Sequence, residues 1–165
     1  MGAGYHGGFG ATQGSKKQAV AKLGSKNDRV KDYTREELVR GIDGITEDAS
    51  FIADMIRNKK IKINVLGDRL FEDYLGVSSD TLAVAVGDQI YLRRSSSSIL
   101  SEIVHEGTHA LDFINKIDVN VISSWTGETR AYSAERKFQI ASGGPVDFEK
   151  EEDMMTHIMK NYKRR

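Results

Sequence analysis

The sequence contains no cysteine, which excludes disulfide bonds, cysteine-ligated zinc, iron–sulfur clusters and thiol catalysis. Neither sign of charge is in excess, because lysine plus arginine and aspartate plus glutamate each number 24. This balance argues against a main role in binding nucleic acid or an anionic membrane. No apolar run approaches the roughly 18 residues of a membrane span. We therefore expect neither a nucleic-acid partner nor a membrane contact.

The length of 165 residues suits one domain preceded by a short arm. Six of the first 14 residues are glycine, which loses more backbone freedom on ordering than any other residue. We interpret residues 1–17 as a flexible arm or linker and residues 18–165 as the domain.

Periodic patterns of apolar residues predict an α+β fold. Residues 60–65 alternate polar and apolar side chains, as in a half-buried strand. Residues 82–86 and 89–93 form a predicted antiparallel hairpin around the tight turn Gly87-Asp88.

Helices are predicted both before and after this hairpin. Thr34 and Glu37 have the spacing of a capping box, but Gly41 and Gly44 are expected to interrupt the helix that follows. Further helices are predicted at residues 18–23, 46–58, 68–75, 98–114, 127–141 and 147–162.

The predicted helix at 98–114 contains the motif H-E-x-x-H as His105, Glu106 and His109. Four residues turn a helix through about 400°, so the two imidazoles lie about 40° apart on one face. Both can reach one metal ion, and Glu106 lies close enough to act on water held there. Gly107 costs roughly 1 kcal/mol of helix propensity, so we expect it to permit close approach of another group, for example the metal-site backbone or substrate. The alternative is two ordinary histidines at helical spacing.

This motif resembles that of the zincin metallopeptidases, and the later segment Glu128-Thr129-Arg130-Ala131 resembles the third-ligand segment of their gluzincin group. Lethal-factor-like enzymes belong to that group. The resemblance implies a small zincin-like fold in which the strand before the active helix, here 89–93, is an edge that pairs with an extended peptide. It also implies Zn²⁺ bound by His105, His109 and Glu128. A two-histidine, one-carboxylate set could hold iron(II) instead, but the motif with its glutamate base favours zinc.

Two other carboxylates lie near these ligands in the sequence. Glu135 is two helical turns after Glu128 on the same face, and it is the alternative third ligand. Asp112 is expected to orient a histidine by accepting its second N–H.

The zincin resemblance implies peptide hydrolysis by metal-activated water, with Glu106 as the catalytic base. A second group should stabilise the tetrahedral oxyanion. Tyr132 is the first candidate for it, because it lies four residues after Glu128 on the same helix face. Tyr91 and His157 are weaker candidates.

We therefore expect a zinc-dependent endopeptidase that acts on a protein or peptide substrate. The glycine-rich start, with residues 9–17, resembles the boundary of bacterial polymorphic-toxin domains. That likeness implies an immunity protein and an N-terminal delivery domain. The alternatives are a cytoplasmic regulatory metallopeptidase and a non-catalytic metal-binding interaction module. No signal peptide is apparent, so we expect the bacterial cytoplasm or delivery by a route without a cleavable signal.

Overall fold

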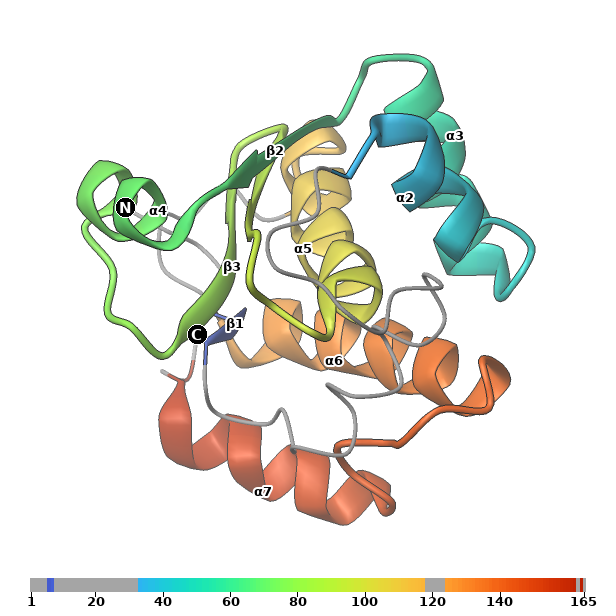
Figure 1. The fold of residues 1–165 in the computed structure, drawn as a ribbon. Coiled ribbons are helices and arrows are strands. Elements are labelled where there is room, and N and C mark those ends of the chain that lie inside the picture. Colours follow the sequence, from blue (N-terminus) through green and yellow to red (C-terminus); the bar gives the residue numbers. More distant parts are fainter. Residues whose placement is uncertain (1–5, 8–32, 118–123, 163, 165) are drawn as a thin grey trace.

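The computed structural model describes residues 6–7, 33–117, 124–162 and 164, and it confirms a mixed α+β architecture (Figure 1). The predicted helix at 18–23 and most of the predicted arm at 1–17 lie outside these residues. The described elements are, in order, β1 His6–Gly7, α2 Arg35–Ile42, α3 Glu47–Arg57, β2 Lys62–Leu66, α4 Asp68–Leu75, β3 Thr81–Val86, β4 Gln89–Arg93, α5 Ile99–Ile114, α6 Trp125–Ala141 and α7 Glu151–Asn161.

Helix α2 begins with the predicted capping box. The Thr34 hydroxyl accepts a hydrogen bond from the Glu37 backbone N–H at 3.2 Å, and the Glu37 carboxylate accepts one from the Thr34 N–H at 3.1 Å. The expectation that Gly41 interrupts this helix is wrong, because α2 continues to Ile42. A Cβ at Gly41 would lie only 2.7 Å from Cδ2 of Leu100, so this glycine allows α2 to pack closely against α5.

The sheet has the order β1-β3-β4-β2. Strands β3 and β4 form the predicted antiparallel hairpin, with Gly87 at a φ of 61° in its turn. Strand β4 also pairs in parallel with β2, from Lys62 opposite Gln89 to Leu66 opposite Arg93. The prediction that residues 89–93 form an edge strand is therefore wrong. Strand periodicity identifies β4 but does not say which strands lie beside it.

Helices cover the two faces of the sheet: α5 lies on one and α4 on the other (Figure 1). Ile90 and Leu92 of β4 point into the main core with α5, whereas Tyr91 points into a smaller cluster with Phe71 of α4. The buried Arg93 joins α4 to the sheet, because its guanidinium donates to the Thr81 carbonyl and to Glu72, both at 2.8 Å. The sheet therefore packs against α5 on one face and against α4 on the other.

Gly107 lies in the middle of α5, where this helix meets α3. A Cβ at Gly107 would lie 2.7 Å from Cγ2 of Ile52, a fully buried residue of α3. The predicted close approach at Gly107 is therefore confirmed, but the group that approaches is the neighbouring helix α3 and not the metal-site backbone or substrate. Glycine at this position lowers the intrinsic helix propensity of α5, and this is the energetic cost of the close packing.

Helix α6 packs along α5, and α7 lies beside α6 (Figure 1). Tyr132 of α6 forms a buried cluster with Met154 and Ile158 of α7. Among the described residues, no helix is both long enough and apolar enough to cross a bilayer.

Candidate metal centre

The two histidines of the H-E-x-x-H motif lie one turn apart on α5, as their spacing predicts. His105 is fully buried and His109 is 8% exposed. Their ring centroids are 5.1 Å apart, and the ring planes meet at 68°. Both imidazoles therefore face the same small region between α5 and α6.

Glu128, in the first turn of α6, brings a carboxylate to both histidines. Its Oε2 lies 3.4 Å from Nε2 of His105, and its Oε1 lies 3.3 Å from Nε2 of His109. The three side chains are buried, and one ligand atom from each lies within 4.8 Å of the others. Tetrahedral zinc with bonds of about 2.0–2.1 Å separates its ligand atoms by about 3.3–3.4 Å. The donor types and their spacing thus suit a metal ion of that size.

The protonation of this cluster follows from burial and opposite charge. Burial disfavours a charged His105, but hydrogen bonds to Glu128 and Glu135 prevail and raise the pKa of His105 to about 9. Burial also disfavours a charged Glu128, but His109 and His105 prevail and lower the pKa of Glu128 to about 2. In the metal-free protein, a proton on His105 therefore supplies the positive charge that faces the carboxylates.

Glu135, the alternative third ligand, contacts the other side of His105. Its Oε2 lies 3.0 Å from Nδ1 of His105, whereas Nε2 of the same ring faces Glu128. A carboxylate on Nδ1 fixes the tautomer that leaves Nε2 available to a metal. The geometry thus favours Glu128 as the ligand and gives Glu135 the role of orienting His105.

Glu106 and Tyr132 complete the surroundings of this centre. Glu106 is fully buried on α5 beside His105. The Tyr132 ring packs edge-on against the His105 ring, with centroids 4.5 Å apart and planes at 78°. Its hydroxyl lies 3.0 Å from the Tyr162 hydroxyl and 3.4 Å from Nε2 of His157. Tyr132 therefore contacts the centre through its ring and α7 through its hydroxyl.

Two other sequence expectations fail here. Asp112 accepts two hydrogen bonds from Arg130 of α6, at 2.9 and 2.8 Å, so the prediction that it orients a histidine is wrong. An arginine guanidinium, which is charged and donates two hydrogen bonds here, binds a carboxylate more strongly than a neutral imidazole does. Tyr91 lies in the α4 cluster, where its hydroxyl donates to Gln89, so it does not belong to the centre.

One face of α6 bears Trp125, Glu128, Tyr132 and Glu135; the last three contact the His105 side chain, whereas the Trp125 indole donates to the Tyr162 carbonyl. The spacings of three, four and three residues place these four side chains on one side of the helix. Trp125 was not among the residues predicted from the sequence, although this periodicity could have found it. Tyr162, which follows α7, was not predicted either, because its contact with Tyr132 depends on how α7 packs against α6.

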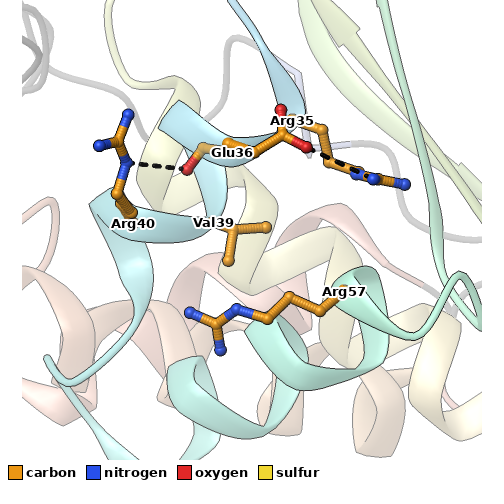
Figure 2. A pocket seen from close by; sticks show the side chains of 5 residues that line it. All are labelled: Arg35, Glu36, Val39, Arg40 and Arg57. Atoms are coloured by element: carbon orange, nitrogen blue, oxygen red, sulfur yellow. Dashed lines mark hydrogen bonds and ion pairs between the residues drawn. The ribbon is translucent and has the colours of Figure 1, made fainter.

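A second charged region lies between α2 and α3. Arg35, Glu36, Val39, Arg40 and Arg57 line a hollow of about 500 Å³, which we call the arginine pocket (Figure 2). Its charges are partly exposed and paired: Arg57 donates to Asp54 at 2.9 Å and also to Asp43, and Arg35 lies 3.4 Å from Glu36. The residues that line this pocket are not among those that form the metal-site cluster.

Comparisons with protein-family models, with curated proteins and with solved structures give no match. The chemistry of the centre itself is therefore the basis on which a function can be proposed.

Proposed function

We propose that this domain is a zinc-dependent endopeptidase of zincin type, with His105, His109 and Glu128 as the metal ligands. The buried convergence of these three side chains is the observation that supports the proposal. Two imidazoles and one carboxylate are a three-residue donor set typical of catalytic zinc, in which a fourth position is left open. Bound zinc would supply Lewis-acid polarisation of a carbonyl and would make water acidic near neutral pH.

The remaining chemistry belongs to the side chains of the chain itself. Glu106, adjacent to the ligand His105, accepts the proton of the attacking water as the new C–O bond forms. It then delivers that proton to the amine as the C–N bond breaks. Glu135 holds the Nδ1 proton of His105, so that the ring stays in one orientation throughout.

Metal content is the first test. We expect about one zinc per chain by elemental analysis of protein purified without added metal. Glu128→Ala should lose this zinc, and Glu135→Ala should weaken its binding without abolishing it. Absence of metal from the wild type, even after zinc is added back and excess is removed, would overturn the proposal.

Cleavage of an unfolded protein is the second test, with Glu106→Gln as the matched control. This variant should keep its zinc and lose at least about a hundredfold in rate, because general base catalysis contributes about 10²–10⁴-fold. Full zinc occupancy with no cleavage by the wild type would favour the non-catalytic metal-binding module instead.

The biological setting is proposed from the sequence alone. A toxin domain should inhibit growth when expressed inside a cell, and Glu106→Gln should abolish that inhibition. Toxicity that persists in Glu106→Gln would contradict a toxic peptidase, and an absence of toxicity would favour a regulatory peptidase.

A further inference from the structure

Two helices bring together the three side chains of the candidate centre: α5 bears His105 and His109, and α6 bears Glu128. A buried ion pair joins the same two helices. Arg130 of α6 donates from Nε and Nη2 to Oδ2 of Asp112 on α5, at 2.9 and 2.8 Å. Asp112 follows His109 by three residues, and Arg130 follows Glu128 by two. The ion pair therefore lies within about one helical turn of a candidate ligand on each helix.

Glu128 and Arg130 leave α6 in nearly opposite directions. Each residue turns a helix by about 100°, so the two side chains are about 160° apart around the axis of α6. Both nevertheless reach α5, because Glu128 faces Nε2 of His105 and of His109 while Arg130 binds Asp112. Helix α6 thus contacts α5 from both of its flanks. A rotation of α6 about its own axis would lengthen one of these contacts.

The apolar packing of α6 does not impose the same constraint. Ala134 and Phe138 join the main core with α5, but the attraction between apolar groups is non-directional. Asp112 is 5% exposed, and a carboxylate buried to this extent destabilises the fold unless it is paired. A rotation or shift of α6 that removed Arg130 from it would therefore be disfavoured.

We propose that Asp112 and Arg130 act as a pair that fixes the rotation of α6 on α5 and so places the Glu128 carboxylate between the two histidines. Both are positioning residues, since they act on the centre through α6. This inference rests on the proposed function, in which Glu128 is a metal ligand. Zinc requires its donor atoms within about 0.2 Å of their ideal distances, so even a small displacement of this carboxylate weakens binding.

Zinc affinity, measured by competition with a chelator, tests the pair. Arg130→Gln removes the guanidinium, and Asp112→Leu removes the carboxylate at a similar size. We expect each variant to weaken zinc binding by about tenfold, which is the lower end of the range for groups that contact a metal ligand directly. Because the two residues act as a unit, the double variant should lose no more than either single variant.

Arg136→Gln is the matched control, because it makes the same chemical change on the same helix. Arg136 donates to the carbonyls of Phe148 and Glu149, at 2.8 and 2.7 Å, and these residues precede α7. This variant should bind zinc as wild type does. Circular dichroism establishes that each protein is folded during the measurement. If Arg130→Gln does not fold, Asp112→Leu carries the test, because the partly exposed Arg130 can turn to water.

Cobalt(II) in place of zinc separates positioning from a general loss of stability. Its visible absorption depends on the number and geometry of the donor atoms. Displacement of Glu128 should change this spectrum in Arg130→Gln and Asp112→Leu. Gly41→Ala, which introduces a clash with Leu100 where α2 meets α5, destabilises the protein away from α6 and should keep the wild-type spectrum.

The inference is overturned if either variant of the pair, when folded, binds zinc within twofold of wild type or shows the wild-type cobalt spectrum. An equal loss of affinity in Arg136→Gln would also overturn it. The expected losses, in a protein that binds zinc but cleaves nothing, would support the pair and contradict the peptidase. Cleavage by the wild type with normal zinc affinity in both variants would do the reverse, and a wild type that binds no zinc would contradict both proposals.

Discussion

The metal centre and the arginine pocket both gather charged side chains, but they do so in opposite environments. At the centre, His105 and Glu128 are fully buried. In the pocket, the side chains of Arg57 and Glu36 are 45% and 66% exposed (Figure 2). Burial of a charge costs several kcal/mol unless partners compensate, whereas exposed ion pairs are screened by water.

This difference distinguishes the candidate metal centre from an ordinary charged surface. The centre aligns two imidazoles and two carboxylates in a region where such groups destabilise the fold unless they are fully paired. A bound metal ion would offset that cost, and strained or costly polar clusters are typical of functional sites. In the arginine pocket, Arg57 is already paired with Asp43 and Asp54 and needs no further ligand.

The largest expected effect is the loss of a ligand. His109→Ala should weaken zinc binding by about a thousandfold or more, because two remaining ligands do not form a stable site. His157→Ala, which changes a histidine of α7, is the control and should bind zinc as wild type does. Competition with a chelating dye measures both, and equal affinities for the two variants would contradict the ligand assignment.

The orienting carboxylate should have the next largest effect. Glu135→Gln should weaken zinc binding by about 10–100-fold, as is usual for partners of metal-bound histidines. Glu36→Gln makes the same chemical change in the arginine pocket and should leave zinc affinity unchanged. A similar loss in both variants would show that net charge, and not the contact with His105, determines the effect.

The dependence of zinc binding on pH should also distinguish the buried His105 of the centre from a histidine with an ordinary pKa. The pKa of His105 is raised to about 9, so below that pH the metal must displace a proton from the ring. The raised pKa stabilises the metal-free fold fully below about pH 6.5, and this contribution is lost as the pH rises towards 9. Zinc affinity should therefore rise by about tenfold per pH unit from 7 to 9, measured with buffered zinc. A zinc affinity that no longer rises above pH 7.5 would indicate that the pKa of His105 is not raised.

Gly107 lies where α5, which bears the centre, meets α3, which contributes Arg57 to the pocket. Gly107→Ala should destabilise the protein by about 1–2 kcal/mol, because the clash with Ile52 outweighs the gain in helix propensity. Chemical denaturation measures this change. Gly67→Ala, where a Cβ meets nothing within 4 Å, is the control, and equal effects would contradict close helix packing.

The smallest effect is expected in the arginine pocket itself. Arg57→Ala removes the contacts to Asp43 and Asp54, yet all three groups are at least partly exposed to solvent. The melting temperature should change by no more than about 3 °C, and zinc affinity should not change. A larger shift in thermal unfolding would indicate that this pocket stabilises the fold as the centre does.

Local patterns in the sequence predicted the helices and strands well, because caps and periodicity act over a few residues. The capping box at Thr34, the hairpin turn at Gly87 and the helix that bears His105 and His109 are confirmed. The position of Gly41 inside α2 was not predicted, since its reason is the side chain of Leu100 on another helix.

The sequence by itself determined that His105 and His109 share one helix face, since helical geometry fixes side chains four residues apart. It also placed Glu128 and Glu135 on one face of a later helix. Only the tertiary structure decided that Glu128 meets both Nε2 atoms while Glu135 meets Nδ1 of His105, because these contacts depend on how α6 lies along α5. The central place of β4 and the contact between the Tyr162 and Tyr132 hydroxyls were decided in the same way, since strand order and long-range helix packing have no local signal in the sequence.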